Sequence, residues 1–328
     1  MVKIKDVAEE AGVAISTVSK VLRNYSKISK ETREKVNEAV KKLNYVPNTM
    51  ASALSSKVSN RVAYYISITD EKQTIDEIYM QNILGAFKGA EEEGYSIVPI
   101  FSYAVNDLTK NQFVNYLKSQ KINDIVFYGL TKNDDRILEL VDDELFNVVT
   151  INAPCLNHHT SFISIDQAQG QYDVAKKTIL ANNGRRILYL TGRTNSFVTE
   201  RRLEGIKRLQ EELHFELTVR NGNFKESEAY NIGLNEAMNY DVIVCASDLM
   251  AIGIINALKK LDIFRPVCGF DGIKLLAYFS EGVETCKQDF YEMSRLAMKE
   301  ITSLRNKNEG RRITYPHSVV TINYEKNI

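Results

Sequence analysis

The sequence predicts an α/β protein in which a three-helix N-terminal domain precedes a larger body of two doubly wound parallel sheets. Apolar residues recur at helical spacing through residues 4–44. From Arg61 onward, short apolar runs typical of strands alternate with helical patterns, and the alternation passes through two successive series. A chain of 328 residues also exceeds what a single hydrophobic core usually serves. We therefore expect a small helical domain and a body of two lobes.

Charge is distributed unevenly along the chain. The 42 basic and 42 acidic residues cancel overall. Residues 1–60, however, hold 11 basic and 6 acidic residues, a net charge of +5, and the remainder holds 31 and 36, a net charge of −5. A basic module joined to a mildly acidic body predicts a polyanionic partner at the N-terminal end only.

The N-terminal pattern predicts a helix-turn-helix. The first helix ends at Gly12, the second covers residues 15–22, and the third covers residues 30–43 with Ser29 as its N-cap. A helix, a short turn and a second helix at this spacing form the geometry that places a recognition helix in the major groove of DNA. A generic helical hairpin is the alternative that the pattern alone leaves open.

The body is expected to bind its ligand at the carboxyl ends of its strands, as doubly wound sheets do. Its first series of strands is predicted at residues 62–68, 95–101, 124–129 and 148–152, with helices near 79–93, 107–119 and 134–142. Its second series is predicted at residues 162–166, 186–191, 241–246 and 266–271, with helices near 168–182, 198–213, 226–238 and 248–260.

Several classes of function are not supported by the sequence. It contains no P-loop, no GxSxG elbow and no HExxH motif, so we expect no enzyme. The cysteines at 155, 245, 268 and 286 form no CxxC pair, and we expect neither a metal nor a cofactor. The N-terminus lacks an apolar signal region and no stretch is long and apolar enough to cross a bilayer, which predicts a cytoplasmic protein that is not attached to a membrane.

Three stretches of the N-terminal region resemble the LacI/GalR family of transcriptional regulators: Ile4-Lys5-Asp6-Val7-Ala8, Ser16-Thr17-Val18-Ser19-Lys20-Val21-Leu22 and Tyr45-Val46-Pro47-Asn48. The resemblance implies that operator DNA is the polyanionic partner. It further implies that residues 48–54 form a hinge helix whose leucine enters the minor groove, although that leucine could instead pack on the body. The implied DNA-binding residues are Ile15, Ser16 and Lys20 at base edges, Thr17 and Ser19 at phosphates, and Asn48 and Leu54 in the hinge.

The body is similar to the same family in the segments Ser247-Asp248-Leu249-Met250-Ala251-Ile252-Gly253, Gly269-Phe270-Asp271-Gly272 and Lys287-Gln288-Asp289-Phe290. Such bodies resemble type I periplasmic binding proteins, in which two lobes close on a sugar. The resemblance implies a helix-turn-helix domain at 1–46, a hinge helix and linker at 47–59, and an effector-binding and dimerisation domain at 60–328. The lobes would comprise about 60–161 with 290–319, and about 162–289 with 320–328.

The same resemblance implies the effector site. Arg202 would grip the ligand, Asp271 and Asn152 would bond its hydroxyls, and aromatic side chains would cover its apolar side. Each residue has a structural alternative, such as a surface charge for Arg202, a helix cap for Asp271 or Asp248, and core packing for Phe290. The complete expected set is Arg202, Asp271, Asn152, Phe224, Phe290, Tyr79, Ser247 and Asp248.

The sequence thus predicts a homodimeric repressor of a sugar utilisation operon, with a galactoside as one candidate sugar, and a small sugar is expected to change its operator affinity. Asp76-Glu77-Ile78-Tyr79 replaces the Asn-Pro-Phe-Phe common in the family, so the sugar itself is not specified. One alternative is a regulator resembling catabolite control protein, whose effector is a phosphorylated carrier protein. The other is a solute-binding protein, which would not carry a DNA-binding module.

Overall fold

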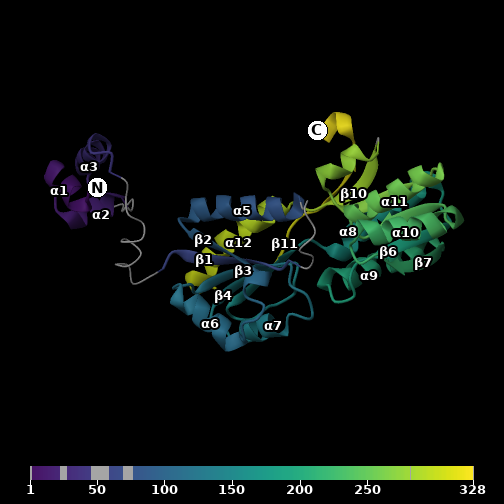
Figure 1. The fold of residues 1–328 in the computed structure, drawn as a ribbon, viewed down its shortest axis with the longest axis horizontal. Helices are drawn as coiled ribbons and strands as arrows, with labels where there is room; N and C mark the ends of the chain where they lie inside the picture. The colour runs from purple at the N-terminus through teal and green to yellow at the C-terminus, as the bar shows by residue number, and fades with distance from the viewer. Residues whose placement is uncertain (1, 23–27, 46–58, 69–76, 281, 328) are drawn as a thin grey trace. The chain divides into compact units, whose positions relative to one another are not determined.

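The structure is a computed structural model that describes residues 2–22, 28–45, 59–68, 77–280 and 282–327. Its chain divides into two compact units, Met1–Asn60 and Arg61–Ile328. Figure 1 shows the helices and strands of both units. Each unit has its own hydrophobic core, so we describe each by itself.

The N-terminal unit contains the three predicted helices. A turn at Gly12, whose φ of 64° suits glycine, separates the first two helices. The predicted N-cap Ser29 accepts a hydrogen bond from the Thr32 backbone N–H at 3.3 Å, and Asn44 follows the third helix in a left-handed conformation. The helices are α1 (Ile4–Glu10), α2 (Ile15–Leu22) and α3 (Lys30–Lys42), and their shared core consists of Val7, Ala8, Val18, Val21, Val36 and Ala39.

The first lobe of the larger unit is a parallel sheet with helices on both faces (Figure 1). The strand order is β11-β5-β4-β3-β1-β2. Helices α5 and α12 cover one face, and α6 and α7 cover the other. The elements are β1 (Arg61–Ile66), α5 (Glu77–Glu93), β2 (Ser96–Phe101), η1 (Ser102–Ala104), α6 (Lys110–Ser119), β3 (Asp124–Tyr128), α7 (Asp135–Asp142), β4 (Asn147–Ile151), β5 (Thr160–Ser164), α12 (Phe290–Arg305) and β11 (Arg312–Thr314).

The second lobe repeats this plan with the strand order β12-β10-β9-β8-β6-β7, in which only β12 runs antiparallel to its neighbour. Helices α8 and α9 pack together, as do α10 and α11. The elements are α8 (Gln167–Asn182), β6 (Arg186–Thr191), α9 (Phe197–Leu213), β7 (Glu216–Asn221), α10 (Glu226–Glu236), η2 (Ala237–Asn239), β8 (Val242–Cys245), α11 (Asp248–Leu261), β9 (Val267–Asp271), η3 (Lys274–Tyr278), β10 (Val283–Lys287), β12 (Ser318–Ile322) and α13 (Tyr324–Asn327).

The central strands are mainly apolar and buried because helices cover both faces of each sheet. In β1 every residue from Val62 to Ile66 is buried, and all four residues of β8 are buried. Two glycines, Gly85 and Gly89, allow α5 to approach α12 closely, since a Cβ at either position would meet the backbone of α12 at 2.6 Å or less. Within the described residues, no helix is both long and apolar enough to cross a membrane.

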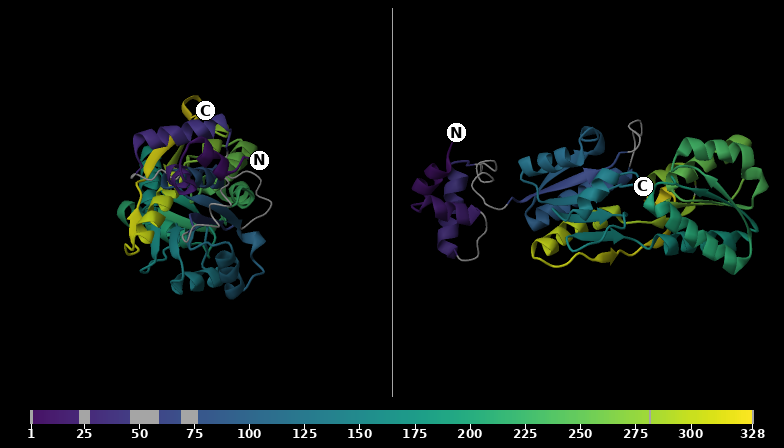
Figure 2. Two further views of the ribbon diagram at one scale, coloured as in Figure 1. Left: turned by 90° about the vertical axis from the view of Figure 1, so that its left-hand side faces the viewer. Right: turned by 90° about the horizontal axis from the view of Figure 1, so that it is seen from below.

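Three segments connect the lobes: residues 165–166, 288–289 and 315–317. Figure 2 shows the body from two further directions, with yellow C-terminal segments contributing to both lobes. Two predicted boundaries differ from this arrangement. The strand expected at 162–166 to open the second lobe is β5, which pairs with β4 and β11 in the first sheet. The second lobe was also expected to resume at residue 320, but β12, which begins at Ser318, already pairs with β10 in the second sheet.

The difference at β5 has a physical reason. Strands β4 and β5 are parallel neighbours, yet the connection from Asn152 to His159 contains no helix. The sequence interpretation assumed that each new strand follows a crossover helix, so it assigned this strand to the next series. The second lobe instead begins with α8 at Gln167.

Candidate functional site

The exposed side of α2 carries the residues that were expected to contact DNA. Val18 and Val21 are buried in the core of the N-terminal unit, which fixes the rotation of the helix. Ile15 is 47% exposed, so its apolar side chain is available for an intermolecular contact. Ser16 and Lys20 are also exposed, whereas Thr17 and Ser19 are half-buried, and the predicted Asn48 and Leu54 lie outside the described residues.

Helix α2 starts without a side-chain cap. Its N-cap position is Ala14, whose carbonyl oxygen accepts hydrogen bonds from the Thr17 and Val18 backbone N–H groups at 2.8 and 3.1 Å. An alanine has no side-chain acceptor for the N–H groups of the first helical turn. The helix therefore depends on packing, rather than on capping, for its stability.

A cleft lies where the carboxyl ends of both parallel sheets meet, as the fold predicts. Its volume is about 160 Å³, which suits a small molecule. The first lobe contributes Ser67, Ile78, Tyr79, residues 128–131, Ile151 and Asn152; the second contributes Arg193, Ser196, Val198, Arg202, residues 223–225, Ser247, Leu249 and Asp271; Gln288 and Phe290 complete the lining.

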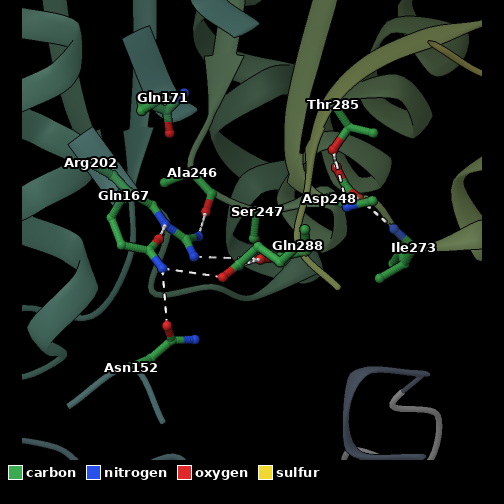
Figure 3. A network of polar contacts seen from close by, with 12 residues as sticks. Asn152, Gln167, Gln171, Arg202, Ala246, Ser247, Asp248, Ile273, Thr285 and Gln288 are labelled. Carbon is green, nitrogen blue, oxygen red and sulfur yellow. Dashed lines mark hydrogen bonds and ion pairs between the residues drawn. The ribbon is translucent and has the colours of Figure 1, made fainter. Parts of the chain in front are cut away.

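Arg202 is the centre of the polar contacts in this cleft (Figure 3). It is only 3% exposed, and its guanidinium carbon lies 3.7 Å from the centre of the Phe270 ring. Its Nε–H donates to Gln167 Oε1 at 2.8 Å, a second N–H donates to the Ala246 carbonyl oxygen, and a third lies 3.5 Å from Asp271 Oδ1. Stacking and hydrogen bonds thus hold a planar cation in the wall of the cleft.

A chain of amide groups joins Asp271 to Asn152 across the two lobes. Gln288 Nε2 donates to Asp271 at 2.9 Å, and Gln288 Oε1 accepts from Gln167 Nε2 at 3.1 Å. The same Gln167 nitrogen lies 3.2 Å from Asn152 Oδ1 (Figure 3). Both Asn152 and Asp271 have positive φ angles, 63° and 121°, which are uncommon outside glycine and occur at binding sites.

Sequence reasoning missed Gln167 and Gln288 as site residues. Gln288 had been noted only as part of a family-like segment, and Gln167 lies just before the helix that was expected near 168–182. Both lie beside segments that connect the lobes, Gln167 after residues 165–166 and Gln288 within residues 288–289. A search for amide side chains next to the predicted lobe boundary could have found them.

Aromatic side chains form the apolar walls of the cleft. Tyr79 and Phe290 each contact Tyr128 edge to face, with ring centres 5.8 and 6.4 Å apart. Phe224 lines the opposite lobe, where the guanidinium groups of Arg193 and Arg202 lie 5.7 and 5.8 Å from its ring centre. The predicted Tyr79, Phe224 and Phe290 therefore all reach the cleft.

Asp248 was expected either to bind the effector or to cap its helix, and the structure supports neither expectation. Its carboxylate accepts hydrogen bonds from the Gly272 and Ile273 backbone N–H groups at 2.7 and 2.9 Å and from Thr285 Oγ1 at 2.7 Å. Figure 3 shows this group apart from the contacts of Arg202. Ser247 is the N-cap of α11 and lines the cleft, whereas Asp248 does not line it.

The surroundings of Asp248 are those of a structural carboxyl group. The residue is fully buried, and this burial raises its pKa well above the ordinary value for aspartate. Hydrogen bonds from Thr285 and from two backbone N–H groups oppose the rise because they favour the charged form. The carboxyl group thus fixes the end of β9, from which Asp271 reaches the cleft.

Two sets of contacts join the lobes beside the cleft. Glu77, the first residue of α5, accepts hydrogen bonds at one carboxylate oxygen from the backbone N–H groups of Lys274 and Leu275, at 2.8 and 3.3 Å. On the other side, the Lys132 backbone N–H donates to the Asn195 carbonyl oxygen at 2.8 Å, and Thr131 pairs with Ser196. We call the Glu77 contact the interlobe brace.

Comparisons with known proteins agree with both parts of this description. Residues 3–48 match the family described as bacterial regulatory proteins, lacI family. Catabolite control protein A from Staphylococcus epidermidis is 27% identical, over 97% of each chain. Two solved structures share the fold: the lac repressor dimer bound to operator and the anti-inducer ONPF (TM-score 0.76, 22% identity, 97% of each chain) and the complex of transcriptional regulator CelR with cellobiose (0.71, 21%, 98% of each chain).

A helix-turn-helix unit followed by a two-lobed domain with a central cleft defines a class of DNA-binding transcriptional regulators. The N-terminal match and the full-length similarity to named regulators agree on this class. Residues 3–48 thus match the lacI family, and the chain as a whole is similar to transcriptional regulators of this type.

Proposed function

We propose that this chain acts as a homodimeric repressor of sugar utilisation genes and that a small sugar in the cleft changes its operator affinity. The observation that carries this proposal is the cleft itself, in which Arg202, Asp271 and Asn152 offer polar groups opposite aromatic walls. Polar side chains that bond hydroxyl groups, together with rings that cover C–H surfaces, suit a sugar. The cellobiose named in the CelR complex supports the same ligand class.

In the proposed DNA contacts, α2 lies in the major groove. Ile15 would contact a thymine methyl group, Ser16 and Lys20 would contact base edges, and Thr17 and Ser19 would contact phosphates. A lysine presents a single charge without the fork of an arginine, so we expect less strict guanine recognition at Lys20. Residues 47–59 would act as the hinge and linker, with Asn48 at its start and Leu54 entering the minor groove.

The proposed dimer uses the body of the protein. One α2 helix covers only half an operator, so a near-palindromic site needs two identical chains related by two-fold symmetry. Helix α5 carries Met80, Leu84 and Phe87 on one side, with exposed fractions of 55%, 53% and 51%. Large apolar side chains at this spacing form a continuous exposed stripe, which supports α5 as part of the interface.

Selection of bound DNA from a random pool tests the main proposal. We expect a near-palindromic sequence whose affinity for the protein falls steeply with salt, because binding of Lys and Arg side chains releases counterions from phosphates.

Two further measurements test the effector and the dimer. One member of a sugar panel should change the operator affinity, and light scattering should show a dimer that Leu84→Asp weakens. Recovery of no consensus sequence, or a monomer on a single half-site, would contradict the proposal.

A catabolite-control regulator remains the second candidate because of the 27% identity with catabolite control protein A. In that case the effector would be a phosphorylated carrier protein bound to the surface of a lobe. The departure at Asp76-Glu77-Ile78-Tyr79 from the common family segment leaves this candidate in place. Pull-down with the phosphorylated carrier, set beside the sugar panel, separates the two candidates.

A further inference from the structure

We infer that Gln167 and Gln288 are positioning residues that turn the amide of Asn152 so that its N–H groups, and not its oxygen, face the ligand of the cleft. The inference rests on the proposed function, since it names what that ligand must present at Asn152: an oxygen that accepts a hydrogen bond. It goes further than the presence of polar groups in the cleft, because an asparagine amide can offer either an acceptor or two donors. The direction of the hydrogen bonds between the lobes carries it.

The two charged ends of the amide chain fix the direction of its hydrogen bonds. A guanidinium has only donors and a carboxylate has only acceptors. At one end, Arg202 Nε–H donates to Gln167 Oε1 at 2.8 Å, so Gln167 Nε2 is left to donate further along the chain. At the other end, Gln288 Nε2 donates to Asp271 Oδ1 at 2.9 Å, so Gln288 Oε1 is left to accept. The two remaining groups meet each other at 3.1 Å as a donor and an acceptor.

Burial makes this direction unfavourable to reverse. The exposed fractions of Arg202, Gln167 and Gln288 are 3%, 5% and 1%. Turning the Gln167 amide around would bring its nitrogen against the Arg202 N–H group and its oxygen against Gln288 Oε1. Buried donors and acceptors that lack a partner are destabilising. Each glutamine amide therefore has one favourable orientation, which the protein sets without a ligand.

The same direction extends to Asn152 in the first lobe. Gln167 Nε2 donates to Asn152 Oδ1 at 3.2 Å, and the Ser164 hydroxyl donates to the same oxygen at 2.8 Å. Figure 3 shows the oxygen of Asn152 directed toward Gln167 and its nitrogen directed away. Asn152 lines the cleft, and among the described residues its nitrogen has no acceptor. The N–H groups of Asn152 therefore remain for a ligand.

The backbone holds the Asn152 side chain at this point. Its φ angle is 63°, in the left-handed region that asparagine and aspartate adopt more readily than most residues. Its backbone N–H donates to the Ile163 carbonyl oxygen at 2.9 Å, just after the end of β4. An aspartate here would keep the backbone conformation and the shape of the side chain but would replace the N–H donors by an acceptor. Exchange of asparagine for aspartate is therefore a direct test of the inference.

Urea unfolding of the ligand-free protein tests the orientation without any effector. In Asn152→Asp the Gln167 and Ser164 donors still meet an oxygen, so we expect the midpoint to equal that of wild type or to rise. Asn157→Asp is the matched control. Asn157 is half-buried in the same connection between β4 and β5, but its nitrogen donates to the Val141 carbonyl oxygen at 2.9 Å, so the control should have a lower midpoint. An equal fall for Asn152→Asp would overturn the inference and leave the proposed function intact.

Titration calorimetry with modified sugars tests which group of Asn152 faces the ligand. The probes are glucose, galactose and cellobiose, each with single hydroxyl groups replaced by fluorine, which accepts weakly and cannot donate, or by hydrogen, which does neither. At the hydroxyl that meets Asn152, wild type should bind the hydrogen derivative about tenfold more weakly than the parent sugar, and the fluorine derivative should keep part of that affinity. Asn152→Asp should bind the parent sugar, whose hydroxyl can donate, and should bind the fluorine derivative most weakly.

Gln167→Glu separates positioning from a structural role. Gln167 is not part of the described lining of the cleft, so the variant keeps every residue of that lining. An oxygen in place of Gln167 Nε2 would turn the Asn152 amide around and bring its oxygen to the cleft. We therefore expect this variant to bind the fluorine derivative most weakly, as Asn152→Asp does.

A purely structural role of Gln167 would instead weaken the binding of the parent sugar and of both derivatives equally, and this result would contradict the inference. Binding of none of the sugars would count against the sugar effector of the proposed function. The comparison of Asn152→Asp with Asn157→Asp would then still decide the orientation of the amide, since it needs no ligand.

Discussion

The two lobes of the body share one architecture but contribute different chemistry to the cleft between them. In the described lining, all four charged side chains, Arg193, Arg202, Lys225 and Asp271, come from the second lobe. The first lobe contributes aromatic rings, backbone and the amide of Asn152. A shared fold therefore does not imply a shared role: the second lobe supplies the charged groups of the described lining, and we expect the first lobe to supply a surface that covers the ligand.

The largest test of this difference is Arg202→Ala. We expect effector affinity to fall at least about 100-fold, because the variant removes charge-assisted hydrogen bonds at a buried position. Operator affinity without effector should stay within a few-fold, since Arg202 belongs to the cleft of the body. Titration calorimetry and operator binding measure the two properties. A normal response of Arg202→Ala to the effector would mean that the second lobe does not grip the ligand.

The framework of the second lobe can be tested through Asp248→Asn. The amide would direct an N–H group at existing donors, and an unsatisfied buried contact of this kind costs about 1–3 kcal/mol in the free energy of unfolding. Denaturant unfolding measures this cost. Under conditions in which essentially all of the variant is folded, its effector affinity should change little. A large loss of affinity in a variant of unchanged stability would place Asp248 in the binding site after all.

The stability difference between wild type and Asp248→Asn should also depend on pH. Burial raises the folded-state pKa of Asp248 to about 6, above its unfolded value. The folded state then binds the proton more tightly, so the contribution of this carboxyl group is complete below its unfolded pKa and falls as pH rises through about 6. Urea unfolding of both proteins should show their difference narrowing from about pH 4 to pH 7. A difference that widens over this range would show that hydrogen bonding outweighs burial.

Glu77→Gln tests the first lobe and should have a smaller effect. The variant keeps an oxygen acceptor for the Lys274 and Leu275 N–H groups but loses the charge, so we expect effector affinity to fall only a few-fold. Glu91→Gln is the matched control, because Glu91 is an exposed residue of the same helix that pairs with Lys88. Equal effects of the two variants would show that the interlobe brace does not contribute to ligand binding.

The smallest expected effect lies outside both lobes, at Ala14→Ser. A serine would supply the missing side-chain acceptor for the first turn of α2 and should stabilise this helix by about 0.5–2 kcal/mol. Amide hydrogen exchange of the full-length protein measures this as slower exchange in α2, with exchange in the body unchanged. Faster exchange in α2 would contradict the assignment of Ala14 as its N-cap.

Much of the fold could be predicted because local signals agree with it. The apolar spacing around Val18 and Val21 predicted both ends of α2, and the alternation of strands and helices predicted two parallel sheets. The edge strand β7 was missed because its residues are mostly exposed and polar, as an edge strand allows. The assignment of β5 was wrong because no helix precedes it, and only the pairing with β4 and β11 shows its sheet.

The candidate site was less predictable, since side-chain direction depends on distant packing. Arg202 and Asp271 were expected in the cleft and line it. Asp248 also follows a buried strand, but only the positions of Gly272 and Thr285 decide that its carboxylate points elsewhere. Gln167 and Gln288 were missed because an uncharged amide gives no signal until the two lobes bring these residues to 3.1 Å from each other.

The interlobe brace has a consequence for how the sequence can vary over evolution. Glu77 bonds two backbone N–H groups, at Lys274 and Leu275, and not their side chains. Every amino acid except proline supplies a backbone N–H, so this contact constrains one partner tightly and the other hardly at all. Substitutions can therefore accumulate at residue 274, and the second lobe can change its outer surface there while the brace to the first lobe is inherited intact.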